Sequence, residues 1–149
     1  MEGKIIYKDL SYKIIGILFE VFNEFGYGYK EKFYEKAIEQ SLYCSGLEFK
    51  RQKRTHIYFR NQLLSRLYLD FLIEDKIVLE LKVGRRFARP NFNQIKQYLS
   101  STGKKLGILA IFTYNGVRYY RILNLYNQPK KLDYSNSKIR KIFFNSTNS

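Results

Sequence analysis

The segment from Leu63 to Val83 constrains the fold more than any other part of the sequence. It contains two apolar stretches, 63–73 and 77–83, separated only by the tripeptide Glu74–Lys76. Antiparallel strands can be joined by so short a loop, whereas parallel strands need a crossover of about a dozen residues or more. The sequence therefore predicts a β-hairpin here.

The length of its loop sets the register of this hairpin. Pairing Ile73 with Ile77 and counting outward places Asp70 opposite Glu80. One face of the hairpin then collects apolar side chains, namely Leu69, Phe71, Ile73, Ile77, Leu79 and Leu81. The other face collects Tyr68, Asp70, Leu72, Val78, Glu80 and Lys82. A slip of one residue would mix the two faces, so the register is well specified.

Hydrophobic periodicity predicts the remaining elements. Segments with apolar residues at helical spacing are 9–25, about 29–45, and 90–99. Segments with a strand pattern, besides the hairpin, are 49–59, 106–113 and 117–123. Asp9 or Ser11 is the candidate N-cap of the first helix, and Asn115-Gly116 is a turn signal between the last two strands.

The element order is therefore α-α-β-β-β-α-β-β. The strands on either side of the third helix can share a sheet only through a crossover. This predicts an α/β fold with a mixed central sheet flanked by helices. The chain has 149 residues, which is the size of one domain. We expect that domain to span 1–123, with 124–149 as a polar, basic and mostly irregular tail that contains one candidate short element at 139–144.

The single cysteine, Cys44, excludes an internal disulfide, a structural zinc site built on several thiolates, and an iron–sulfur cluster. We expect its thiol to be buried in the last turn of the second helix. The start of the chain lacks the pattern of a secretory signal, and no apolar run approaches the ~18–20 residues of a membrane span. These features predict an intracellular, cytoplasmic protein with no membrane partner.

The charge of the chain favours a polyanionic partner. There are 27 Lys and Arg residues against 13 Asp and Glu residues, a formal net charge of +14. Each basic residue that neutralises a phosphate releases condensed counterions, so nucleic acid is the natural partner. The alternative is that the charge serves solubility or follows the base composition of the genome.

The charged face of the hairpin carries the chemistry. Two carboxylates opposed across a ladder repel, and a divalent cation with hard oxygen ligands, Mg²⁺ or Mn²⁺, would compensate for Asp70 and Glu80. Lys82 lies on the same face, where it can pair with the acids in the absence of metal and orient a water during reaction. The alternative is a surface face in which Lys82 only neutralises two acids. Leu72 and Val78 on this face indicate partial burial, which favours a site.

These residues resemble a known signature. Asp70, nine intervening residues and Glu80-Leu81-Lys82 are similar to the D-(x)n-(D/E)-x-K pattern of the PD-(D/E)XK nuclease superfamily. The segment 28–34 resembles the motif of its GxxExxY branch, and 9–16 is similar to the first helix of that branch. The segment 94–98 resembles the Q-x-x-x-Y motif of RecB-type nucleases. The resemblance covers roughly 9–123 and implies a restriction-endonuclease-like core.

The resemblance also implies roles for single residues. Asp70, Glu80 and the backbone carbonyl of Leu81 would hold Mg²⁺ or Mn²⁺, and Lys82 would position the attacking water. Glu31 would face the same site as a further ligand or water holder. The alternative for Glu31 is a solvated acid in the first turn of a helix.

Gln94 and Tyr98 would line the cleft in this resemblance, whereas the alternative is an ordinary helix flank beside core residues. The cysteines that hold an iron–sulfur cluster in some RecB-like enzymes are absent, so no such cluster is expected. Leu69 stands where a proline often precedes the aspartate.

Basic residues near these motifs are candidates for nucleic-acid contact. They are Lys53, Arg54, Arg85, Arg86, Arg89 and Lys96. Arg85, Arg86 and Arg89 lead from the Glu80 strand into a helix N-terminus at Pro90, a favourable place for a phosphate. The tail adds Lys130, Lys131, Lys138, Arg140 and Lys141 as a nonspecific electrostatic arm. His56 has no partner pattern and is interpreted as a bystander.

Three functions remain at this point. The leading one is a metal-dependent DNA nuclease with Asp70, Glu80 and Lys82 at its centre. The second is a catalytically weak nucleic-acid-binding subunit of a repair or defence complex, and the intact signature argues against it. The third is a dimeric, structure-selective endonuclease similar to a junction resolvase. The sequence leaves open DNA or RNA, exo or endo cleavage, single-stranded, duplex or branched substrate, and monomer, homodimer or larger complex.

Overall fold

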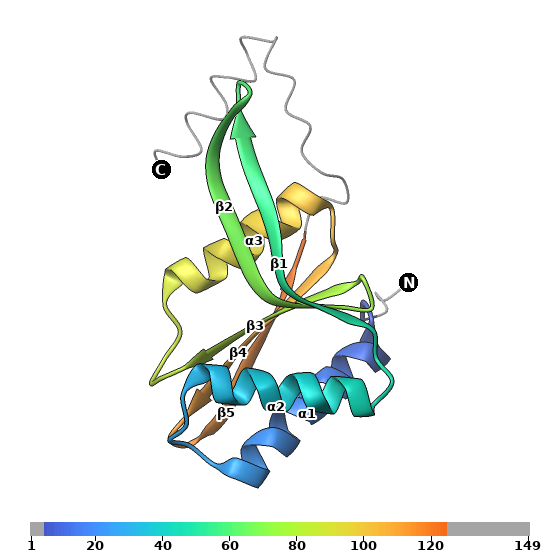
Figure 1. Ribbon diagram of the computed structural model, residues 1–149, viewed down its shortest axis with the longest axis vertical. Coiled ribbons are helices and arrows are strands. Elements are labelled where there is room, and N and C mark those ends of the chain that lie inside the picture. The colour runs from blue at the N-terminus through green and yellow to red at the C-terminus, as the bar shows by residue number, and fades with distance from the viewer. Residues whose placement is uncertain (1–4, 125–149) are drawn as a thin grey trace.

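The computed structural model describes residues 5–124 (Figure 1). The helices are α1 (Lys8–Phe25), α2 (Glu31–Cys44) and α3 (Arg89–Thr102). The strands are β1 (Phe49–Phe59), β2 (Gln62–Ile73), β3 (Ile77–Val83), β4 (Leu106–Thr113) and β5 (Gly116–Leu123). This is the predicted order, with helix ends that differ by a few residues. The tail beyond 124, with its candidate element at 139–144 and its basic residues, lies outside the described residues.

The five strands form one mixed sheet in the order β1-β2-β3-β4-β5. β3 and β4 are parallel and are connected through α3, while the other neighbouring strands are antiparallel. α1 and α2 lie on one face of the sheet and α3 lies on the other (Figure 1). The predicted α/β fold with a mixed central sheet flanked by helices is confirmed.

Each face of the sheet has its own apolar core. Ile14, Leu18 and Ile38 pack on one face against strand residues that include Phe71 and Leu79. The other core gathers strand and α3 residues, among them Leu67, Leu69, Leu72, Val78, Ile95, Tyr98 and Leu99. α3 approaches β4 closely because Gly107 has no side chain; a Cβ there would stand 2.5 Å from Cγ2 of Ile95. Neither α3 nor any other helix within 5–124 combines the length and apolarity needed to cross a membrane.

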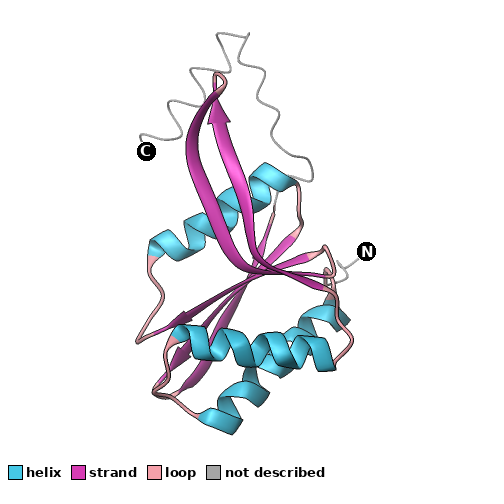
Figure 2. Ribbon diagram, in the orientation of Figure 1, coloured by secondary structure: helices cyan, strands magenta, loops and turns pink. Residues whose placement is uncertain are grey.

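The β1–β2 hairpin bends sharply where it leaves the body of the molecule, and its outer part projects as a two-stranded ribbon, residues 53–69, called the arm below (Figure 2). Gln52 has a left-handed φ of 48° inside β1, at the position opposite Asp70. Such a residue breaks the alternation of side chains along a strand. At the same level β2 changes face as well: Phe71 packs in the core with α1 and α2, whereas Leu69 packs in the core with α3.

The bend changes two predictions for the hairpin. The face assignment of Leu69 is wrong, because the strand turns over between Leu69 and Phe71. The β2–β3 ladder pairs Ile73 with Ile77, 72 with 78 and Phe71 with Leu79, as predicted, but the pairing ends there. The pairs predicted beyond it, 70 with 80 and 68 with 82, do not form because β2 turns away from β3.

Two smaller predictions for the helices are also wrong. The thiol of Cys44 is exposed, because the last turn of α2 presents it outward. The N-cap of α1 is Tyr7, in a left-handed conformation and without a side-chain cap hydrogen bond. Ser11, one of the two predicted caps, is buried inside the helix instead.

Candidate active site

The divergence of β2 from β3 brings two carboxylates to the unpaired edge of β3. The backbone N–H of Leu81 donates to Oδ2 of Asp70 at 2.7 Å. The backbone N–H of Asp70 donates in turn to Oε2 of Glu80 at 3.4 Å. The two side chains therefore accept hydrogen bonds that ladder partners would otherwise take, which holds Asp70 and Glu80 next to each other without a ladder pair.

Lys82 neutralises part of this acidic group. Its Nζ lies 3.2 Å from Oε1 of Glu80 and 4.0 Å from Oε1 of Glu31. Pairing of Lys82 with the acids in the absence of metal was expected from the sequence. The side chain of Glu80 is only 4% exposed, so its charge depends on this ion pair.

The turn before α2 places Glu31 at the site. Gly28 has a φ of 127°, which side chains rarely allow. Tyr34 is fully buried, and its hydroxyl donates to the carbonyl of Gly26 and accepts from the N–H of Tyr29 at 3.2 Å. The glycine and the tyrosine of the segment 28–34 thus shape the connection that delivers Glu31 to Lys82.

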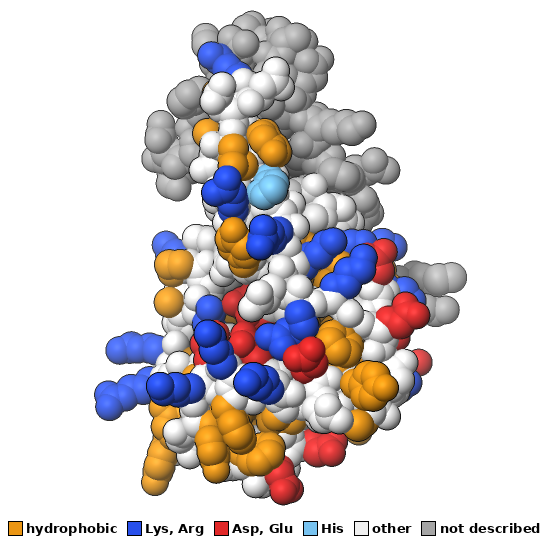
Figure 3. Space-filling view, in the orientation of Figure 1, with side chains coloured by type: hydrophobic (Ala, Val, Ile, Leu, Met, Phe, Trp, Pro, Cys, Tyr) orange, Lys and Arg blue, Asp and Glu red, His pale blue; other side chains and the backbone are white. Residues whose placement is uncertain are grey.

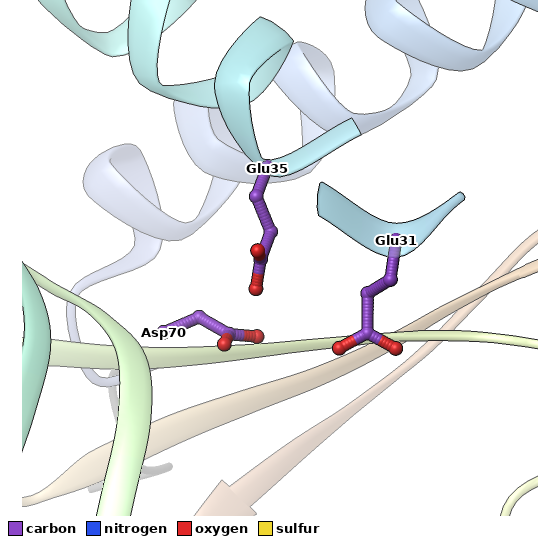
Figure 4. A group of neighbouring side chains, drawn as sticks. All are labelled: Glu31, Glu35 and Asp70. Carbon is purple, nitrogen blue, oxygen red and sulfur yellow. The ribbon is translucent and has the colours of Figure 1, made fainter. Parts of the chain in front are cut away.

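Glu35 is a site residue that the sequence reasoning missed. Carboxylate oxygens of Glu31, Glu35 and Asp70 all lie within 4.8 Å of one another (Figure 4). Glu31 and Glu35 are four residues apart in α2 and therefore share one face of the helix. Because Glu31 was already a candidate site residue, this four-residue spacing could have predicted Glu35 as a second one. Arg51 lies beside the group, with Nη2 3.6 Å from Oε2 of Glu35.

Burial and crowding raise the pKa values of these acids. Burial raises the pKa of Asp70 to about 6, and the nearby charge of Glu80 adds to this effect. Burial, together with a hydrogen bond to Asp70, raises the pKa of Glu35 to about 7. That hydrogen bond favours the ionised form of Asp70 and the protonated form of Glu35, so Glu35 is the donor of the pair.

The ionisation of the other groups depends on Lys82. Burial raises the pKa of Glu80 and of Glu31, and Lys82 opposes both shifts. For Lys82, burial alone would lower the pKa, but Glu80 and the other acids outweigh it and raise the pKa. Lys82 is therefore a cation at neutral pH. A cluster of carboxylate oxygens with a deficit of positive charge fits a hard divalent cation such as Mg²⁺ or Mn²⁺.

Protonation of Glu35 predicts an unusual pH dependence of stability. Because its pKa is higher in the folded chain than in the unfolded chain, the folded state binds more protons between about pH 4.5 and 7, and stability falls as pH rises through this window. In the presence of a chelator, we expect the melting temperature to fall between pH 5 and pH 8, and to fall less in Glu35→Gln. Equal slopes for the two proteins in thermal melts would contradict this. Glu39→Gln, one turn further along α2, is the matched control.

Basic side chains surround the acidic group. Figure 3 shows Lys and Arg side chains around acidic ones between α2 and the base of the arm. Of the residues predicted to contact nucleic acid, Lys53 is half-buried and the others are exposed, namely Arg54, Arg85, Arg86, Arg89 and Lys96. Beyond the carboxyl end of β3, a hollow of about 510 Å³ is lined in part by Tyr27, Arg85, Tyr114 and Arg118. Its lining combines cationic and aromatic side chains.

The two α3 residues predicted to line the cleft separate in the structure. Nε2 of Gln94 donates to the carbonyl of Tyr68 at 2.7 Å, so Gln94 supports β2 two residues before Asp70. Tyr98 is 1% exposed and packs in the core between α3 and the sheet. The structure brings Gln94 to the edge of the site and leaves Tyr98 in the core.

Comparison with known proteins gives a family match over most of the chain. The sequence matches the family model of the PD-(D/E)XK nuclease superfamily over residues 8–122. No curated protein matches it. Among solved structures, it is similar to that of SSO0001, with 14% identity and a TM-score of 0.43 over 95% of this chain and 87% of the other. It is also similar to an alkaline exonuclease (LHK-Exo) from Laribacter hongkongensis, with 10% identity and a TM-score of 0.46 over 98% of this chain and 82% of the other.

Proposed function

The chain belongs to the PD-(D/E)XK nuclease superfamily and has its restriction-endonuclease-like fold, and we propose that it is a metal-dependent nuclease that hydrolyses phosphodiester bonds of DNA. One observation carries the proposal. Asp70, Glu80 and Lys82 meet where β2 leaves β3, with Glu31 and Glu35 of α2 beside them. We also propose that the chain belongs to the GxxExxY branch; the glycine, the glutamate and the tyrosine of that motif, Gly28, Glu31 and Tyr34, lie at the site or in the turn that leads to it.

Asp70, Glu80 and the carbonyl of Leu81 would hold Mg²⁺ or Mn²⁺, with Glu31 or Glu35 as a further ligand. Bound there, the ion would lower the pKa of a water and stabilise the charge that develops on the phosphate. The Nζ of Lys82 lies 3.2 Å from Oε1 of Glu80, and we propose that this cation orients the attacking water. Gln94 acts as a positioning residue, because it holds the backbone of β2 next to Asp70.

Basic residues on both sides of the acidic group would hold the substrate. Arg85, Arg86 and Arg89 follow β3 toward the N-terminus of α3, where backbone N–H groups favour a phosphate. Lys53 and Arg54 lie at the base of the arm, and Lys96 lies on α3. We propose DNA as the substrate, with RNA as the alternative. The protein would act in the cytoplasm as a monomer or homodimer, alone or within a larger complex.

The test is cleavage of labelled single-stranded, duplex and branched DNA, and of RNA, with Mg²⁺, with Mn²⁺ or with EDTA. We expect DNA cleavage with metal and none with EDTA. Salt-sensitive binding without cleavage under any metal would overturn the proposal in favour of a binding subunit. Cleavage confined to branched DNA by a protein of dimeric mass would replace it with a structure-selective endonuclease.

A further inference from the structure

The arm is a basic ribbon with no acidic side chain. Residues 53–69 include Lys53, Arg54, Arg60 and Arg66 and contain neither Asp nor Glu. Figure 3 shows basic, histidine and hydrophobic side chains along it. A segment of uniform positive charge that projects from the body destabilises itself by repulsion, and a polyanion would relieve this.

The two faces of the arm differ in what covers them. One face packs on α3 through Leu67 and Leu69, which are buried. On the other face, the side chains at alternate positions of β1 and β2 are exposed; they are Arg54, His56, Tyr58, Arg66 and Tyr68. Cross-strand pairing sets Arg54 opposite Tyr68 and His56 opposite Arg66, so these side chains form one continuous surface. We call it the arm face.

Aromatic rings on the arm face alternate with cations. The guanidinium of Arg54 lies over the ring of Tyr68, 5.5 Å from its centroid. The rings of His56 and Tyr58 meet edge to face, with centroids 6.1 Å apart. Tyr58 is 55% exposed and Tyr68 is 45% exposed, so both rings present area to solvent. Exposed aromatic rings between basic side chains are what proteins use to bind unpaired bases, by stacking on the rings and charge pairing with the phosphates.

The arm face leads directly to the acidic group. Tyr68 and Asp70 are two residues apart in β2, a rise of about 7 Å along a strand. The carbonyl of Tyr68 is held by Gln94, which fixes this part of β2 relative to the body. A strand that lies along the arm face would therefore reach the carboxylates at the base of the arm.

We propose that the arm face binds single-stranded nucleic acid, with bases stacked on Tyr58 and Tyr68 and phosphates held by Arg54 and Arg66, and that it guides one strand to Asp70. This inference rests on the proposed nuclease function and specifies its substrate. A two-stranded ribbon also fits the major groove of a duplex, but a duplex offers no base face for stacking on exposed rings. Duplex binding is therefore the outcome that the experiment must separate.

The experiment measures binding by fluorescence anisotropy in EDTA, so that it is independent of cleavage. The full-length protein is titrated with a labelled single strand and with a duplex of the same sequence. We expect the double variant Tyr58→Ala, Tyr68→Ala to bind the single strand at least about thirty-fold more weakly and to bind the duplex with little change, since each stacked base contributes ~1–3 kcal/mol and the variant removes two stacking rings. Replacement of both residues by Phe should retain single-strand binding, because the rings remain.

Further variants separate stacking from charge and from folding. Arg54→Gln with Arg66→Gln should weaken binding to both probes and reduce its salt dependence. Tyr12 and Tyr43, which are 80% and 74% exposed on helices, give matched Tyr→Ala controls that should bind normally. The single variant Tyr58→Ala, far from both cores, tests the idea if the double variant melts early.

Equal loss of duplex and single-strand binding in the tyrosine variants would overturn the inference in favour of groove binding. Unchanged single-strand binding would overturn it as well. Metal-dependent cleavage with unchanged binding by these variants would leave the nuclease function standing and remove only the role of the arm. Conversely, single-strand binding through the tyrosines by a protein that cuts nothing would retain the arm as a binding surface and remove the nuclease function.

Discussion

Replacement of Asp70 by Asn is expected to abolish cleavage and to stabilise the metal-free protein at the same time. The change removes a charge from the proposed metal site, and loss of a group that stabilises transition-state charge costs about 10²–10³-fold or more in rate. The amide oxygen can still accept the hydrogen bond from the N–H of Leu81. Because burial and Glu80 raise the pKa of Asp70 to about 6, the ionised acid is a net cost to the fold at neutral pH. A neutral side chain removes that cost.

The measurement pairs initial cleavage rates in Mg²⁺ with melting temperatures in EDTA at pH 7.5. Asp75→Asn is the matched control, since Asp75 lies in the turn of the same hairpin and pairs with Lys104 at 3.0 Å. We expect this control to cut normally. A residue with only a structural role would lose activity and stability together. Near-normal cleavage by Asp70→Asn would remove this carboxylate from the proposed chemistry.

The hairpin shows how far the sequence predicts this site. Loop length and alternation gave the register at Phe71 and Leu79 correctly, because local pairing depends on nearby residues alone. The same reasoning extended the ladder to Asp70 and Glu80, where it fails. The ladder ends at the level of Gln52, which is distant in sequence from both acids and has a left-handed conformation that its residue type does not predict.

The wrong part of the ladder prediction concerns how Asp70 and Glu80 are arranged, and it leaves both residues in the same part of the hairpin. A continued ladder would have set the two carboxylates directly opposite each other, where they repel. The bend instead leaves the N–H groups of Asp70 and Leu81 unpaired, and the acids bind them. α2 adds Glu31 and Glu35, whose carboxylate oxygens lie within 4.8 Å of one another and of Asp70. The sequence signature survives in the structure, but the backbone irregularity decides how its residues meet.

Helix residues were harder to assign than strand residues, for a physical reason. Glu31 and Glu35 share a helix face, but only the packing of α2 on the sheet decides that this face meets Asp70. Gln94 and Tyr98 also share a helix face, yet one reaches a backbone carbonyl at the surface and the other enters the core. Spacing within a helix predicts which side chains share a face. Tertiary packing decides which residues of the rest of the fold that face contacts.

Replacement of Lys82 by Met should separate catalysis from metal binding. We expect cleavage to fall about 10²–10⁴-fold, because the cation proposed to orient the attacking water is lost. Affinity for Mn²⁺ should stay the same or rise, since Lys82 pairs with Glu80 and Glu31 and so competes with a divalent ion for the same carboxylates. The melting temperature in EDTA should fall at neutral pH, because the buried Glu80 loses its counter-ion.

The loss of stability expected in Lys82→Met should depend on pH. Lys82 opposes the rise in the pKa of Glu80 that burial causes, so without Lys82 that carboxyl takes up a proton more readily. The difference in melting temperature between Lys82→Met and the natural chain should therefore shrink as pH falls from 8 to 5, because protonation of Glu80 removes the uncompensated charge in the variant. Lys104→Met is the matched control, because Lys104 forms an ion pair with Asp75 in the turn of the same hairpin. This variant should leave cleavage and Mn²⁺ affinity unchanged. Loss of Mn²⁺ affinity in Lys82→Met would show that the lysine holds the carboxylates in place instead of acting on the water, and its role would then be to position the metal ligands.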